Sequence, residues 1–384
     1  MKNKIRRFAG LSFAGVAMFV GVNIPAVEFE LLVTQSPPGP QNTDPANWSG
    51  VLQFHLTASG GVLNPETGID KTNLNDPAGL GFRPSTSELF VGNRWGNSSA
   101  SSISRFIYDP VTRRLAPNGT ITGNGLFGVH QITFSPVTGE MFAANYGNGV
   151  SRFTFDANGN ALANGMIGSG TMRGVAVSPD GRRLYASSVS SVIRQFDLTT
   201  GAELGSVIVP SGVGGLHYFQ IQAGRLYVAA PSDNCIYRYL IGTNDDLTLV
   251  DAVTNTLAAI AVTLSPDGQD MFVSGHKVSD LIYRFAHNPQ DDSWTDMGTI
   301  DTGSSLGGIL TIPSGPQPDI TLTPTNSAVV SWCSIPAGWN LQVNTNLTTT
   351  NWVVPAETVL DNGTYKFIVV TPPAGNRFYR LQSQ

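Results

Sequence analysis

The chain has 384 residues, of which 42 are glycine, 24 are proline and only 13% are charged. This composition is typical of many short strands joined by tight turns, and it argues against a helical bundle. The formal charge of −5 gives no basic excess for phosphate contacts, so we expect no nucleic-acid partner.

Residues 1–26 are predicted to be a signal peptide. Four basic residues precede the apolar stretch Phe8–Val22, and Ile24–Ala26 offers an imperfect cleavage site because its first position is usually smaller than isoleucine. The stretch is short for a bilayer span, which needs about 20 residues, so a retained anchor is the less favoured alternative. Cleavage removes four positive charges and leaves a formal charge of −9. We expect a secreted, periplasmic or cell-surface protein without an integral membrane span.

Residues 27–313 contain one pattern that recurs five times. Each copy has an apolar strand, a Ser-Pro or equivalent turn, a strand reading [LM]-[FY]-[VA], a polar loop, a strand ending Arg-Phe or Arg-Tyr, and a last short strand. The equivalent first-strand positions, 52, 43, 44 and 43 residues apart, are Phe82, Phe134, Val177, Ile221 and Leu264. This period predicts the four-stranded antiparallel blades of a β-propeller.

A sixth blade can be assembled from both ends of this region. Residues 29–33, 50–54 and 61–63 match a second, third and fourth strand, and Gly307–Pro313 matches the missing first strand. Pairing Gly307–Pro313 with Leu31–Val33 closes the ring through ladder hydrogen bonds, each worth about 1 kcal/mol net. The predicted fold is therefore all-β, with a six-bladed β-propeller whose last blade is closed by N- and C-terminal strands.

Residues 314–319 form a Pro-rich linker, and residues 320–384 read as a small C-terminal β-sandwich of Ig- or fibronectin-like type. The candidate strands are Ile320–Leu322, Ala328–Trp332, Trp339–Val343, Trp352–Val354, Lys366–Val370 and Phe378–Leu381. The tryptophans of this module either fill its core, which we favour, or form a sugar-stacking platform. Cys235 and Cys333 fall in different domains and are expected to be buried thiols.

Ser178–Ala186 (SPDGRRLYA), Phe196–Gly201 (FDLTTG) and Ile103–Leu115 resemble the repeats of YVTN-type and lactonase-like propellers. The resemblance covers residues 27–313 and implies architecture; its members include lactone hydrolases, quinoprotein relatives and binding proteins. The tail ending at Asn376–Leu381 is similar to C-terminal modules of secreted bacterial proteins, which implies export or surface retention. Calcium-dependent members imply a Glu near the first blade with Asn and Asp ligands. Glu28 lies near that place but lacks the Gly-Pro-x-Trp context, so we assign no metal and no cofactor.

Aligning the repeats brings six residues to one ring position at the mouth of the central channel. They are Ala78, His130, Arg173, His217, Ile260 and Gly308. His130, Arg173 and His217 become neighbours, where they could polarise a carbonyl group and shuttle a proton to a lactone. They could equally bind a carboxylate, or serve only as hydrogen-bonding residues that hold the ring together.

Loops between second and third strands supply further ligand-binding candidates at the same mouth. These are Asn93, Trp95, Tyr146, Asp233 and His276. The aromatic rings could stack on a sugar and the polar groups could reach hydroxyls, although Asn is also an ordinary turn former. Asp76 either binds a ligand or anchors a turn, which we favour. His55 and His287 are expected on outer strands or loops without an evident partner.

Two common catalytic motifs are missing from the sequence, the GxSxG elbow and the GxxxxGK[ST] phosphate loop. We therefore rank first a secreted, non-catalytic binding propeller for a small polar or carbohydrate-like ligand or a protein partner. The alternatives are a lactonase-like hydrolase of a sugar lactone that uses His130, Arg173 and His217, and a structural surface protein.

Overall fold

The computed structural model describes part of the chain, and it separates into two compact units, Val27–Gly315 and one that contains Pro316–Gln384. The described residues are 29–35, 50–57, 62–66, 74–94, 101–110, 112–210, 215–275, 280–303, 305–313, 318–322, 326–333, 339–346, 349, 351–361 and 365–383. The predicted signal peptide, Glu28, Trp95 and His276 lie outside them. No helix in the described ranges is long and apolar enough to cross a membrane.

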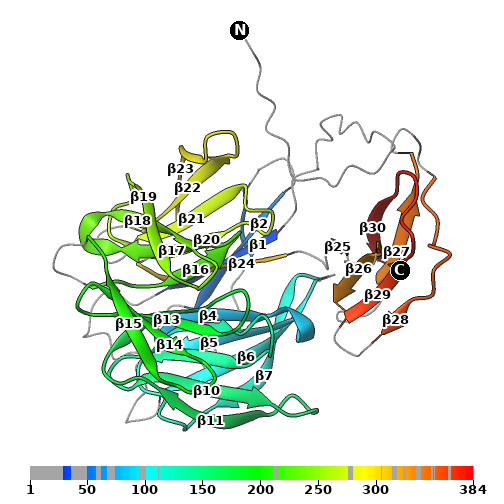
Figure 1. The fold of residues 1–384 in the computed structure, drawn as a ribbon. Coiled ribbons are helices and arrows are strands. Elements are labelled where there is room, and N and C mark those ends of the chain that lie inside the picture. Colours follow the sequence, from blue (N-terminus) through cyan, green and yellow to red (C-terminus); the bar gives the residue numbers. More distant parts are fainter. Residues whose placement is uncertain are drawn as a thin grey trace. The chain divides into compact units, whose positions relative to one another are not determined.

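The first unit is a β-propeller of four-stranded antiparallel sheets (Figure 1). Sheet 1 contains β4 (Pro77–Arg83), β5 (Glu88–Asn93), β6 (Ser102–Asp109) and β7 (Arg114–Ile121). Sheet 2 contains β8 (Val129–Phe134), β9 (Met141–Asn145), β10 (Gly149–Phe155) and β11 (Ala161–Ile167). Sheet 3 contains β12 (Met172–Val177), β13 (Arg183–Ser188), β14 (Val192–Asp197) and β15 (Glu203–Ile208).

The later repeats form two more sheets of the same kind. Sheet 4 contains β16 (Phe219–Gln222), β17 (Arg225–Ala230), β18 (Cys235–Ile241) and β19 (Leu247–Val253). Sheet 5 contains β20 (Ala259–Leu264), β21 (Asp270–Gly275), β22 (Leu281–Asn288) and β23 (Ser293–Asp301). Short 3₁₀ turns follow β4 and β17, at Pro84–Thr86 and Pro231–Asp233.

The remaining sheet of this unit, the seam sheet, joins strands from both ends of the unit. It contains β24 (Leu306–Pro313), β1 (Phe29–Gln35), β2 (Val51–Leu56) and β3 (Val62–Glu66), in that order. The expected pairing of β24 with β1 is present, with Leu32 opposite Leu310. The innermost strands contact one another in turn, and β24 contacts both β20 and β4, so they form a closed circuit.

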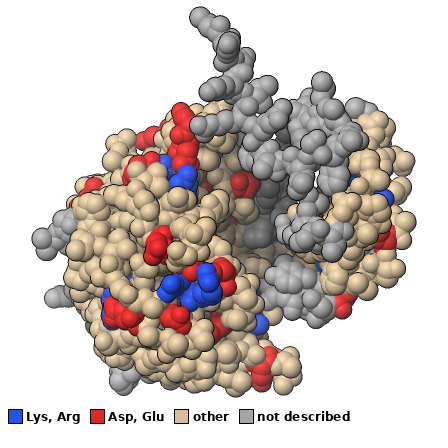
Figure 2. All heavy atoms as spheres, viewed as in Figure 1, with Lys and Arg blue, Asp and Glu red and all other residues tan. Residues whose placement is uncertain are grey.

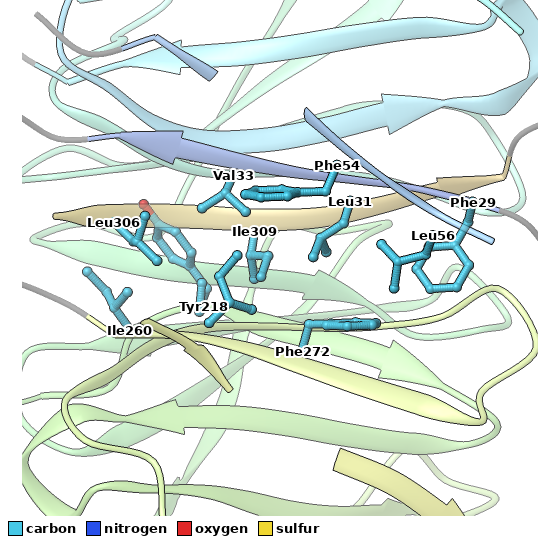
Figure 3. Close-up of a cluster of buried hydrophobic side chains, with 12 residues drawn as sticks. Phe29, Leu31, Val33, Phe54, Leu56, Tyr218, Ile260, Phe272, Leu306 and Ile309 are labelled. Atoms are coloured by element: carbon cyan, nitrogen blue, oxygen red, sulfur yellow. The ribbon is translucent and has the colours of Figure 1, made fainter. Parts of the chain in front are cut away.

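Apolar side chains hold the seam sheet against its neighbour. Leu31, Phe54 and Ile309 pack with Phe272 of sheet 5 (Figure 3). The rings of Phe29 and Phe272 meet edge to face with centroids 5.8 Å apart. Burial of this apolar surface, at about 25 cal/mol per Å², adds to the ladder bonds that close the ring.

The recurring Arg-Phe or Arg-Tyr pair has a structural explanation in sheets 1–5. The aromatic residues are each at most 2% exposed and fill the space between neighbouring sheets: Phe106, Phe153, Phe196, Tyr239 and Phe285. Each arginine pairs with a carboxylate of its own sheet: Arg105 with Glu88, Arg152 with Glu140, Arg194 with Glu203, Arg238 with Asp251, and Arg284 with Asp270. We call these five pairs the arginine belt. In the seam sheet, Gln53 stands in this place and donates to Glu30.

Charge is otherwise sparse on the molecule. In the view of Figure 2 the main group of blue Lys and Arg atoms is bordered by red Asp and Glu atoms, and most of the surface is tan. The two outer histidines do have acidic partners, contrary to expectation. His55 Nδ1 lies 2.9 Å from the buried Glu30, and His287 Nε2 lies 3.0 Å from Asp292. Glu30 lies on the strand next to that of His55, and Asp292 lies in the turn that follows the strand of His287.

The second unit contains two sheets. One consists of β25 (Asp319–Leu322), β26 (Ala328–Cys333), β29 (Tyr365–Val370) and β28 (Leu360–Asp361), and the other of β27 (Trp339–Asn344) and β30 (Phe378–Ser383). A single apolar cluster contains side chains of both sheets, including the buried Trp332. The strand expected at 352–354 is wrong, because only Val353 forms an isolated bridge there, with Val343. Cys235 is a buried free thiol, and the Cys333 side chain is not described.

Candidate functional site

First strands begin and second strands end at the same opening of the propeller. The Arg94 N–H, just after β5, donates to the Asp76 carbonyl, just before β4, at 3.0 Å. In sheet 2 the Tyr146 N–H reaches the Gly128 carbonyl at 3.1 Å in the same way. This end is the mouth at which the sequence predicted a site.

Close packing of neighbouring inner strands fixes two of the predicted ring residues. A Cβ atom on Gly79 would lie 1.5 Å from the His130 carbonyl oxygen, and one on Gly174 would lie 2.1 Å from that of His217. Only glycine permits this approach. His130 and His217 are therefore located by backbone contact with the preceding sheet.

Arg173 and His217 form the central polar contact of the mouth. The distance from Arg173 Nη1 to His217 Nε2 is 2.8 Å. Because a guanidinium can only donate, His217 Nε2 is the accepting nitrogen and the imidazole is neutral in this contact. Among the described residues no carboxylate forms an ion pair with Arg173, so it keeps its positive charge, unlike the arginines of the belt.

His130 and Tyr146 form the adjoining wall. Their rings stack with centroids 5.6 Å apart and an interplanar angle of 19°. His130 Nδ1 lies 2.8 Å from the Gly128 carbonyl oxygen, which only accepts, so Nδ1 carries a proton and Nε2 is the basic nitrogen of the neutral ring. The Arg173 guanidinium lies 5.7 Å from the Tyr146 ring centroid, which joins the two walls.

Gln131 fixes the strands that carry this group. Its side-chain oxygen accepts from the Val175 N–H at 2.9 Å and from the Phe219 N–H at 2.8 Å. One side chain of β8 therefore bonds to both β12 and β16. This bridge sets the spacing of His130, Arg173 and His217, and the sequence reading did not single it out.

Three more residues of the mouth, Tyr218, Arg94 and Asp76, were not among the predicted site residues, although Asp76 was considered as a ligand. Tyr218 lies beside Leu306 and Ile260 (Figure 3), and its ring meets those of His130 and His217 with centroids 6.4 and 6.5 Å away. Burial raises the pKa of Tyr218; the charges of Arg94 and Arg173 oppose this and that of Asp76 adds to it. Arg94 and Asp76 form a bidentate ion pair at 2.9 and 3.2 Å. Their place at the mouth could have been predicted from the repeat, because Asp76 directly precedes the first strand of sheet 1 as Gly128 precedes that of sheet 2.

The other predicted ligand-binding residues do not all join this group. Asn93 is 1% exposed and lies inside its sheet, where its amide accepts from the Asn75 N–H and donates to Ser102 and Ser104. Asp233 accepts a hydrogen bond from Tyr237 at 2.9 Å. Trp95 and His276 fall outside the described residues. The structure thus brings together His130, Tyr146, Arg173 and His217.

The described residues include no group of three His, Cys, Asp or Glu side chains arranged to hold a metal ion. A separate pocket of about 250 Å³ borders β19 and β23, with Arg238, Asp251 and Trp294 among its lining residues. None of the predicted site residues lines it.

No protein-family model matches the sequence, and no curated protein matches it significantly. Solved structures do resemble it. A periplasmic gluconolactonase from Pseudomonas aeruginosa has a TM-score of 0.54 and 16% identity, over 93% of this chain and 99% of that one. A Bacteroides uniformis protein named provisionally as a 6-phosphogluconolactonase has a TM-score of 0.53 and 16% identity, over 92% of this chain and 99% of that one. A chain of a nidogen–laminin complex has a TM-score of 0.55 and 13% identity, over 74% of this chain and 99% of that one. At these identities the likeness shows the β-propeller fold.

Proposed function

We propose that this protein is a lactonase-like hydrolase that opens a sugar-type lactone at the channel mouth. The observation that carries the proposal is the Arg173–His217 contact at 2.8 Å beside the stacked His130, which combines a retained positive charge with a basic imidazole nitrogen. The lactonases among the structural neighbours favour this function over binding alone.

In the proposed reaction water attacks the carbonyl carbon of the lactone. His130 Nε2 takes a proton from the water as the new C–O bond forms. Arg173 donates hydrogen bonds to the carbonyl oxygen as it becomes negative, and His217 positions the guanidinium. The ring C–O bond then breaks, the leaving oxygen takes the proton from His130, and a hydroxy acid is released.

Around this site we propose a six-bladed propeller, with the seam sheet as the last blade and the two-sheet unit as a β-sandwich module. The closed circuit of inner strands supports the blade count. We also propose that residues 1–26 direct export and that the mature chain acts in the periplasm or outside the cell, as the name of one neighbour suggests for that protein.

A second candidate function is binding without turnover, of a small polar or carbohydrate-like ligand. The exposed Tyr146 ring and the guanidinium fork of Arg173 favour it, because stacking and bidentate contacts are sufficient to hold an acidic sugar. The nidogen–laminin neighbour is a reminder that this fold also occurs in protein complexes.

The test is lactone hydrolysis by purified residues 27–384, with calcium and with chelator, beside a His130→Ala/His217→Ala variant that still folds. Turnover that the double variant loses supports the hydrolase. Well-folded protein without turnover across a broad lactone panel refutes it and favours binding. Turnover that disappears with chelator would contradict a mechanism without a metal.

A further inference from the structure

Two aromatic side chains stand exposed at the mouth in sheet 2. Phe127 is 43% exposed and Tyr146 is 36% exposed. The Phe127 ring lies against Gly147, since a Cβ atom on that glycine would be 3.4 Å from the ring. Phe127 therefore adjoins the turn that carries Tyr146, and Tyr146 in turn contacts His130 and Arg173.

Hydrogen bonds of a buried asparagine hold the backbone that exposes Phe127 and Tyr146. Asn145 is fully buried, and its side-chain oxygen accepts from the Phe127 N–H at 3.1 Å. Its amide nitrogen donates to Ser151 Oγ at 2.9 Å, and the Tyr146 N–H donates to the Phe127 carbonyl at 2.9 Å. A buried, satisfied amide thus fixes the backbone on which both rings are presented.

Sheet 1 has the same buried asparagine, but its turn presents a different side chain. Asn93 is buried like Asn145, and its oxygen accepts from the Asn75 N–H as that of Asn145 does from Phe127. Where sheet 2 presents Tyr146, sheet 1 presents Arg94, paired with Asp76. One side of the mouth is therefore ionic and the next side is apolar.

Sheet 3 also exposes an apolar side chain at the end where its second strand stops. Val189, in the turn between β13 and β14, is 48% exposed, and the backbone at Gly215, two residues before His217, passes close to it. We call Phe127, Tyr146 and Val189 the apolar rim. Three side chains are too few for a protein interface, which buries about 800 Å² per partner.

We infer that the lactone which this site takes carries an apolar substituent, alkyl or aryl, that lies on the apolar rim while its carbonyl group meets Arg173. This inference rests on the proposed function and makes its substrate a lactone with an apolar substituent, in place of a fully hydroxylated sugar lactone. A ligand with hydroxyl groups all round would leave the rim in water and gain nothing from it.

Binding of non-hydrolysable δ-lactams to residues 27–384 tests this independently of turnover. Calorimetry would compare piperidin-2-one with its 6-propyl and 6-pentyl derivatives. We expect Kd to fall about two- to fourfold per methylene in the wild type, since a buried methylene is worth up to about 0.8 kcal/mol. In Phe127→Ser the dependence of Kd on alkyl chain length should shrink strongly. Adding Val189→Ser to that variant should reduce the dependence further. Ile208→Ser, an 82% exposed site on β15 outside the rim, should keep it.

A parallel series of δ-lactones separates the two proposals. Chain-dependent lactam binding without any lactone turnover would refute the hydrolase and keep the apolar substituent. Turnover with no chain-length dependence in either series would keep the hydrolase and overturn the inference. Undetectable lactam binding, or a dependence unchanged in Phe127→Ser, would also overturn it.

Discussion

In the arginine belt, Arg105 and Arg152 each face a carboxylate, whereas Arg173 at the mouth faces the neutral ring of His217. These two belt pairs are neutralised and largely buried, so losing one partner would leave a poorly solvated charge. At the mouth the positive charge of Arg173 is retained, because its partner is a neutral imidazole. The same residue type therefore stabilises the fold in one place and prepares for a ligand in the other.

The largest expected effect is on catalysis at the mouth. His130→Asn keeps a donor near the Gly128 carbonyl but removes the basic Nε2, so kcat/KM for a lactone should fall about 100-fold or more. The matched change His287→Asn, in sheet 5 beside Asp292, should keep full activity. Steady-state kinetics on both proteins decides this, and equal activity would remove His130 from the mechanism.

The next effect is on stability in the belt. Arg105→Met leaves the carboxylate of Glu88, which is 2% exposed, without its cation, and should cost about 3 kcal/mol of unfolding free energy. Arg114→Met, at an exposed site on β7, should change it by about 0.5 kcal/mol or less. Urea unfolding measures both. Equal stability of the two variants would show that the belt does not hold the fold.

A pH dependence is expected through Asp292, which lies outside the five pairs of the belt but contacts the belt residue Arg238 at 3.2 Å. Burial would raise the pKa of Asp292, but the His287 hydrogen bond and the charges of Arg238 and Arg225 outweigh it and lower the pKa. A lowered pKa in the folded state stabilises the fold above the unfolded pKa, about 3.9, and this stabilisation is lost as the pH falls. Asp292→Asn should thus be less stable than wild type at pH 7, and the gap should close below about pH 4. Urea unfolding at several pH values checks the trend; a constant gap would contradict it.

The smallest expected effect concerns the stacking wall. Tyr146→Leu removes the ring that faces His130 and Arg173, and should weaken ligand binding by about 1 kcal/mol, or about fivefold in Kd. Tyr146→Phe keeps the ring and should bind nearly as the wild type does. Calorimetry with a lactam that binds the wild type would show the difference, and similar losses in both variants would assign the effect to the hydroxyl group.

Local pattern was enough to predict the strands but not their polar partners. The period and the alternation located β4 to β24 and the seam pairing, because each blade repeats one local sequence. Ring alignment brought His130, Arg173 and His217 together for the same reason. The Glu30 partner of His55 and the bridge made by Gln131 depend on contacts between separate strands, which periodicity does not encode, whereas the Asp292 partner of His287 lies only five residues further along the chain. Asn93 was placed at the mouth by position, yet its amide turns inward to satisfy the backbone.

The most direct test of the contrast between belt and mouth is one paired measurement on Arg173→Met and Arg152→Met, in which lactone turnover and melting temperature are read for each. We predict that Arg173→Met lowers kcat/KM about 100- to 1,000-fold with little change in melting temperature. Arg152→Met should lower the melting temperature and keep the turnover of the folded protein. Wild-type turnover in Arg173→Met, or a loss of stability in it as large as in Arg152→Met, would contradict the assignment of Arg173 to the site.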